Sequence, residues 1–176
     1  AARKALQIDP ELAEAHTAIA HIHHYEWEWA NAEQGFRRAL EFNPGYPHAH
    51  SRYSQYLTSR GRLEEAVVEA RRAEELDPLS VTMKWHLGNI LEHCRRHDEA
   101  IRQLQETLEL DPNYPWVHWT LGISYTNKSM FADAIASLEK AVALSKSPSF
   151  MAWLASAYAM SGNTVQARKL LGELMD

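Results

Sequence analysis

The sequence has little cysteine and no excess of basic residues, and both facts narrow its function. Its 176 residues include one cysteine, Cys94, which excludes an intrachain disulfide framework and a four-cysteine zinc site. The 18 Lys and Arg residues are outnumbered by 23 Asp and Glu residues, which gives a net charge of −5. A general nucleic-acid binder needs a basic stripe, so we expect no nucleic-acid partner.

Long apolar runs are also missing. No run approaches the length of about 18 residues that reads as a membrane-spanning helix, so we expect no membrane contact. The sequence starts without an initiator Met or a signal peptide, and its first residues already follow a helical pattern. We therefore expect a cytoplasmic protein, and a fragment of a longer chain.

The motifs of common enzymes do not occur in the sequence. It contains no G-x-G-x-x-G, no G-x-x-x-x-G-K-[ST], no G-x-S-x-G and no H-E-x-x-H. We therefore predict that the protein is not an enzyme and needs no cofactor.

Histidine is abundant, with ten copies. Helical spacing brings together two candidate metal-binding sets: His21, His24 and His48, and His93 with Cys94 and His97. No second carboxylate or cysteine completes a tetrahedral shell in either set, so we predict no metal. A histidine-lined surface leaves open a partner affinity that depends on pH between about 5 and 8.

Proline occurs at a fixed interval. Four of the seven prolines are 34 residues apart: Pro10, Pro44, Pro78 and Pro112. A fifth copy of the surrounding pattern carries Lys146 at the proline position, after which the register slips by one residue. A fixed period of this length indicates a solenoid built from repeated units.

Each period has the pattern of two helices. Leu87, Ile90, Leu91 and Cys94 follow one another at i, i+3, i+4 and i+7. Turns of about three residues, such as Ser59–Gly61, separate the two helices and favour antiparallel neighbours. The repeating prolines end one helix, and Pro47, Pro115 and Pro148 suit the first turn of the next. The sequence therefore predicts an all-α fold.

Small residues recur at one position of the repeat: Ala20, Ser54, Gly88, Gly122 and Ala155. A glycine inside a helix costs about 1 kcal/mol relative to alanine. Glycine at this position in two repeats therefore predicts that paired helices approach closely there.

The motif His118-x-x-Leu121-Gly122-x-x-Tyr125, followed by Ala134-x-x-x-Leu138, resembles the tetratricopeptide repeat. The resemblance implies a right-handed superhelical solenoid of antiparallel helix pairs. It covers residues 1–176 as one solenoid, with 1–12 as the tail of a preceding repeat and with repeats 13–46, 47–80, 81–114, 115–147 and 148–176. The chain departs from the family at its usual Trp or Tyr opening position, where it has His16, His50, Lys84, His118 and Met151.

The segment from Tyr25 to Trp29 carries a weaker resemblance. It is similar to the repeat-containing tails of bacterial winged-helix transcription factors and Ser/Thr kinases, which implies a module of a larger bacterial regulatory protein. Trp27 and Trp29 have two interpretations: they cover the edge of the first helix pair, or they offer an exposed apolar contact.

The family implies a scaffold whose first helices line a concave groove for a peptide or helix of a partner protein. The groove positions carry His21, His24, Tyr25, His48, Gln55, Trp85, Asn89, His93, Trp116, Trp119 and Asn127. Tryptophan is enriched among binding hot spots, so we expect Trp85, Trp116 and Trp119 to contact the partner. Local packing between helices is the alternative role of these tryptophans.

The family also includes clamps that hold a C-terminal carboxylate with paired cations and asparagines. The matching positions here are Trp116 and Thr120 or, one repeat earlier, Ser51, Gln55 and His86, and none is a cation. We therefore expect no carboxylate clamp.

Self-association is the alternative function. A solenoid needs polar surfaces at its two ends. The last predicted helix instead carries Leu170, Leu171, Leu174 and Met175, which a second copy of the chain could cover to form a homo-oligomer.

Overall fold

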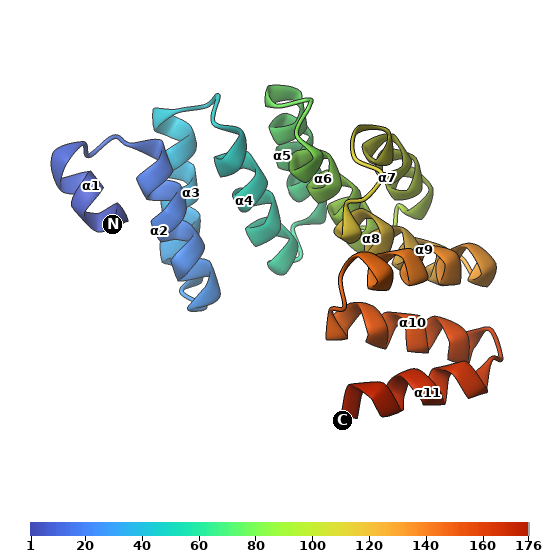
Figure 1. Cartoon of the computed structure of the whole chain (residues 1–176). Coiled ribbons are helices and arrows are strands. Elements are labelled where there is room, and N and C mark those ends of the chain that lie inside the picture. Colours follow the sequence, from blue (N-terminus) through green and yellow to red (C-terminus); the bar gives the residue numbers. More distant parts are fainter. Residues whose placement is uncertain (176) are drawn as a thin grey trace. The chain divides into compact units, whose positions relative to one another are not determined.

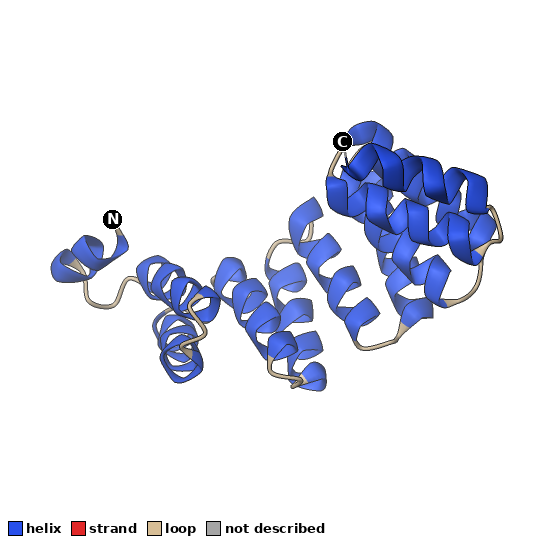
Figure 2. Ribbon diagram, turned by 90° about the horizontal axis from the view of Figure 1, so that it is seen from below, coloured by secondary structure: helices blue, strands red, loops and turns tan. Residues whose placement is uncertain are grey.

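The chain is all-α, as the sequence predicts. A computed structural model describes residues 1–175, and within them eleven helices are joined by short loops and no strand occurs (Figures 1 and 2). The helices are α1 (Ala2–Ile8), α2 (Ala13–Tyr25), α3 (Trp29–Phe42), α4 (Pro47–Ser59), α5 (Leu63–Leu76), α6 (Val81–His93), α7 (His97–Leu110), α8 (Pro115–Asn127), α9 (Phe131–Leu144), α10 (Pro148–Met160) and α11 (Thr164–Met175). Over these residues, no helix has both the length and the apolar character needed to cross a bilayer.

The helices form two compact units. Unit 1 is Ala1–His93 and contains α1 to α6, and unit 2 runs from Cys94 onward and contains α7 to α11. The boundary falls at the turn inside the third 34-residue period, between α6 and α7. Each unit is described separately below, and the single continuous solenoid stays a prediction.

Proline sets both ends of the connections between helix pairs. Pro47, Pro115 and Pro148 occupy the first turn of α4, α8 and α10, where a missing N–H leaves no intrahelical hydrogen bond unmade. The residue before each of the four periodic prolines has a φ between −131° and −141°, which is outside the helical range: Asp9, Asn43, Asp77 and Asp111. The proline ring disfavours the helical conformation at the preceding residue and so favours the end of the helix there.

The histidines at the opening position of three helix pairs link each pair to the loop before it. In each case the ring Nε2 donates a hydrogen bond to the carbonyl oxygen of the proline six residues earlier. The distances are 2.8 Å for His16 to Pro10, 2.9 Å for His50 to Pro44 and 2.8 Å for His118 to Pro112. Histidine at the opening position of the repeat, where the family usually has Trp or Tyr, therefore has a structural role in these three pairs.

Within unit 1, α2, α4 and α6 form a continuous layer. Helix α4 packs against both α2 and α6, whereas α3 and α5 make no contact with each other over residues 1–175. The first helices of the pairs (α2, α4 and α6) touch one another, whereas the second helices (α3 and α5) are farther apart. This difference makes unit 1 concave on the side of α2, α4 and α6. We call these three helices the inner layer of unit 1. Unit 2 follows the same pattern, with α8 touching α10.

The two helices of a pair approach closely at positions where one of them carries glycine. A Cβ atom added at Gly35 of α3 would lie 2.8 Å from the Cβ of Ala20 in α2. A Cβ atom added at Gly122 of α8 would lie 2.3 Å from Cγ of Leu138 in α9, closer than real Cβ contacts allow. Leu138 is fully buried. The predicted close approach is therefore confirmed at Gly122.

We expect Gly122→Ala to destabilise unit 2 by about 1–3 kcal/mol, because the added methyl group overpacks the contact with Leu138. Gly172→Ala in α11 is the matched control, since nothing lies within 4 Å of a Cβ added there. The control should be neutral or stabilising by up to about 1 kcal/mol through helix propensity. Urea unfolding of both variants checks this, and equal effects would contradict the close approach.

Candidate functional site

The part of the inner layer contributed by α2 is a cluster of imidazole and aromatic rings. The rings of His21 and Tyr25 are 4.8 Å apart and meet edge to face, and Tyr25 is 70% exposed. The Ser59 hydroxyl donates to the Gln55 carbonyl oxygen, so His24 Nε2 donates to Ser59 Oγ, 3.0 Å away on α4. The structure thus brings His21, His24 and Tyr25 together and ties them to the next inner helix.

Polar side chains connect α4 to α6. Arg52 donates from Nη1 to Gln55 Oε1 at 3.2 Å. Gln55 Nε2 in turn lies 3.1 Å from Nδ1 and 3.2 Å from Nε2 of the His86 ring. Gln55 is a predicted site residue, whereas Arg52 and His86 are additions from the structure. The signal for Arg52 was its spacing, because it lies three residues before Gln55 and therefore on the same helix face.

Arg52 adds a cation that the comparison of clamp positions does not include. The positions matched to a carboxylate clamp carry no cation, yet Arg52 supplies a positive charge to the same layer. Its charge contributes to lowering the pKa of His21 on α2 and of His86 on α6, so it acts on both neighbouring helices.

Three imidazoles of this layer, those of His21, His24 and His86, have a lowered pKa and are neutral at pH 7. Burial is the main cause that lowers the pKa of His86 from 6.5 to about 4, followed by the charges of Arg52 and His48. Burial also leads for His21, whose pKa falls to about 4, followed by Arg52 and His24. Burial lowers the pKa of His24 as well. Arg52 therefore carries the lasting positive charge among these groups.

The other predicted residues of unit 1 lie along α4 and α6. The partly buried Trp85 lies beside His86 with ring centroids 4.6 Å apart, and His93 Nδ1 donates to the Asn89 carbonyl oxygen at 3.0 Å. His48 is exposed in the first turn of α4, with its ring 5.6 Å from that of Tyr46.

In unit 2, Trp116 and Trp119 pack around Phe150 of α10. Trp119 stacks on Phe150 at 5.6 Å between centroids, and Trp116 meets Phe150 edge to face at 5.0 Å. Trp119 therefore contributes to packing between α8 and α10, while Trp116 keeps 40% of its surface exposed. Asn127 is exposed at the last residue of α8. Trp85 belongs to unit 1, so these tryptophans do not share a unit.

Trp27 and Trp29 have different roles. Trp29 lies 6.3 Å from the ring of the buried Tyr56 and beneath the guanidinium of Arg60, 5.0 Å from the ring centre. Trp27 has a φ of 64° and is 74% exposed. Trp29 therefore covers the edge of the helix pair, and Trp27 offers an apolar surface.

One group of side chains has the spacing of a metal site, at a place the sequence did not indicate. One ligand atom each from His23, Glu26 and Glu28 lies within 4.8 Å of the other two. His23 Nδ1 is 2.6 Å from Glu28 Oε2, and Glu28 also accepts a hydrogen bond from Asn31. The two carboxylates are exposed, and these contacts link the side chains of the turn to one another.

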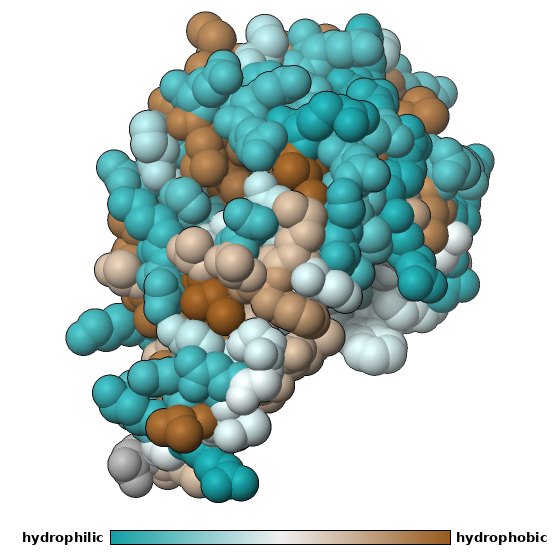
Figure 3. Space-filling model, turned by 90° about the vertical axis from the view of Figure 1, so that its right-hand side faces the viewer, coloured by the Kyte–Doolittle hydropathy of each residue, from teal (hydrophilic) through white to brown (hydrophobic). Residues whose placement is uncertain are grey.

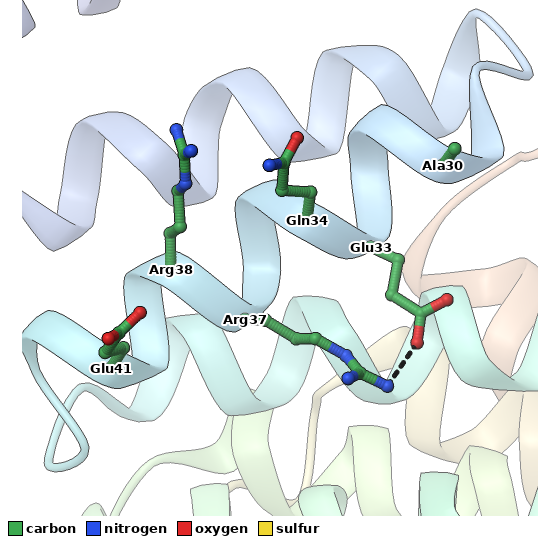
Figure 4. Close-up of a pocket in the computed structure, with 6 residues that line it drawn as sticks. All are labelled: Ala30, Glu33, Gln34, Arg37, Arg38 and Glu41. Atoms are coloured by element: carbon green, nitrogen blue, oxygen red, sulfur yellow. Dashed lines mark hydrogen bonds and ion pairs between the residues drawn. The ribbon is translucent and has the colours of Figure 1, made fainter.

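A shallow depression lies outside the inner layer, on α3 (Figure 4). It has a volume of about 560 Å³ and is lined by Ala30, Glu33, Gln34, Arg37, Arg38 and Glu41. Arg37 pairs with Glu33 at 2.8 Å, as the dashed line shows. None of the predicted site residues lines it.

The lowered histidine pKa values predict that acid weakens the fold through this layer. Between pH 6.5 and about pH 4, His86 binds a proton in the unfolded chain but not in the folded chain. The contribution of neutral His86 to the free energy of unfolding is therefore complete above pH 6.5 and is lost as the pH falls toward 4. We expect His86→Gln to lose less stability than the wild type between about pH 7 and pH 5. Urea unfolding at both pH values checks this, and parallel losses would contradict it.

Comparison with known families gives two matches. A family model described as "TPR repeat" matches residues 96–129, and one described as "Tetratricopeptide repeat" matches residues 120–174. A comparison with curated proteins finds no match.

Solved structures show the same fold. The chain is similar to pilF of Pseudomonas aeruginosa, with 24% identity, a TM-score of 0.80, and coverage of 92% of this chain and 74% of that one. It is similar to TTC0263, a thermophilic TPR protein of Thermus thermophilus, with 20% identity, a TM-score of 0.82, and coverage of 93% and 90%. It is also similar to YrrB, described as a TPR protein with an unusual peptide-binding site, with 19% identity, a TM-score of 0.68, and coverage of 100% and 91%.

The helix pairs of 34 residues, the close approach at Gly122 and the two family matches agree. Residues 96–174 match tetratricopeptide repeat models, and the chain has the fold of tetratricopeptide repeat proteins.

Proposed function

We propose that the inner layer of unit 1 binds an extended or helical segment of a partner protein. The observation that carries the proposal is the set of polar and aromatic side chains on α2, α4 and α6, which are neighbours in space. Helix α2 gives His21, His24 and Tyr25, α4 gives Arg52 and Gln55, and α6 gives Trp85, His86 and Asn89.

The composition of this layer suits a peptide better than a small apolar ligand. Tyr25 and Trp85 offer aromatic area, and such side chains dominate the energy of protein interfaces. Gln55 and Asn89 carry amide groups that can pair with the backbone of a bound segment. A segment lying across α2, α4 and α6 would meet both kinds of group, which is the requirement for recognition in a groove.

Trp116 is a separate candidate contact within unit 2. It keeps 40% of its surface exposed beside Phe150 and can offer an aromatic contact without giving up that packing. Trp119 is more engaged with Phe150, so its truncation would disturb unit 2 itself.

The setting of the module is part of the proposal. The resemblance of the segment from Tyr25 to Trp29 to repeat-containing tails supports a place in a larger bacterial regulatory protein, and the single cysteine agrees with a reducing, cytoplasmic compartment. The peptide-binding site named for YrrB, which has the same fold, agrees with peptide recognition here.

Selection of peptides of about 12 residues from a displayed random library tests the proposal. We expect the chain to enrich specific peptides, and Tyr25→Ala to weaken their binding at least about tenfold, the equivalent of about 1.4 kcal/mol. Tyr25 is 70% exposed, so its truncation should leave the fold intact.

Val68→Ala is the matched control for that experiment. Val68 is 65% exposed on α5, outside the inner layer, so its truncation should leave peptide affinity unchanged. Equal losses for the two variants, or no enrichment of any peptide, would count against the inner layer as the binding surface.

Self-association is a second candidate, because α11 presents apolar side chains to solvent. Val165, Leu171 and Met175 are 77%, 49% and 83% exposed, while Leu170 packs on the buried cluster around Leu138 and Leu154. Figure 3 shows apolar patches among polar ones on the lowest part of the molecule, where α11 lies. A second copy of the chain covering this surface would remove apolar area from water.

For this candidate we expect the molar mass from light scattering to fall from dimer to monomer on dilution. Leu171→Lys with Met175→Lys should give a monomer throughout, while Val68→Lys should behave as the wild type. A wild-type monomer at every concentration would reject self-association through α11.

A further inference from the structure

Arg52 lacks the partner that a partly buried arginine usually has. Its described polar contact is the hydrogen bond to Gln55 Oε1, and no carboxylate of residues 1–175 lies within ion-pairing distance of it. Arginine is seldom withdrawn from water unless an anion pairs with it. The guanidinium has five N–H donors, so most of them stay available to a ligand.

The groups around Arg52 do not supply the missing charge. His21 on α2 and His86 on α6 are neutral at pH 7, and His48 is a further imidazole. Glu14 and Arg52 both act on the hydroxyl of Tyr46, yet the two do not form an ion pair. Glu92 lies on α6 two turns after Trp85, buried and already engaged. Arg52, in the middle helix of the inner layer, therefore carries a positive charge that forms no ion pair within residues 1–175.

Resting on the peptide-binding function above, we propose that Arg52 receives an acidic side chain of the bound segment. A carboxylate matches the fork of N–H groups and can accept two parallel hydrogen bonds. Gln55 orients the guanidinium from its own helix by accepting one of its N–H groups. A single arginine among neutral rings suits one negative charge better than a phosphate group, which is usually held by a cluster of arginines.

The net charge of the chain opposes the binding of an acidic segment. At −5 the whole protein repels acidic peptides weakly, so a preference for Asp or Glu has to come from a local site. Salt should weaken such a preference, because it screens charges that are accessible to solvent.

The test is the peptide selection carried out on four forms of the chain: wild type, Arg52→Gln, Arg52→Glu and Arg38→Gln. Arg38 is exposed on α3, so its substitution removes the same charge outside the inner layer. We expect wild type and Arg38→Gln to enrich peptides with Asp or Glu at one position. Replacing that acidic peptide residue by Asn or Gln should weaken the binding of the peptide to the wild type and to Arg38→Gln about tenfold or more. The same replacement should weaken its binding to Arg52→Gln less than twofold.

The Arg52→Glu form should reverse the preference toward Lys or Arg, and circular dichroism would show that each variant is folded. If Arg52→Gln is unfolded, Arg52→Lys replaces it and should keep a reduced acidic preference. Selected peptides without a common acidic position would overturn the role of Arg52 and leave peptide binding standing. Tighter binding of phosphoserine at that position would overturn the assignment to a carboxylate, and no enriched peptide at all would overturn both proposals.

Discussion

The close contact between the two helices of a pair is the constraint on which the rest of the structure depends. Gly35 lies against Ala20, and Gly122 against Leu138, at distances that leave no room for a further methyl group. Helix α4 also contacts α2 and α6, whereas α3 and α5 do not contact each other within residues 1–175. The inner layer is a consequence of that difference, and so is the curvature that gathers its side chains.

The inner layer uses histidine for two different purposes. The opening histidines, such as His50, hydrogen-bond to proline carbonyl oxygens and fasten each helix pair to its preceding loop. His21 and His86 instead lie within the layer as neutral rings beside Arg52. The first role follows the 34-residue period, whereas the second depends on neighbours from three helices. These histidines of the inner layer therefore contribute to packing and to the local charge.

Periodicity allowed the fold to be predicted from the sequence, while the details of the site were only partly accessible. The prolines predicted where helices end, because their effect acts on the adjacent residue, and Gly122 predicted a close approach. A comparison of repeat positions misses Arg52, because Arg52 lies between two compared positions, Ser51 and Gln55. The packing of Trp119 on Phe150 was left open because it depends on a contact between different helix pairs.

Recognition of a partner is proposed for the side of the molecule formed by α2, α4 and α6. The most direct measurement is a nuclear magnetic resonance titration of the isotope-labelled chain with a peptide that it selects. We expect the chemical-shift changes to concentrate on α2, α4 and α6, including the side chains of Gln55 and Trp85, while the surface of α3 around Arg38 stays unchanged. Shifts confined to α3 and α5, with α2, α4 and α6 unaffected, would contradict it.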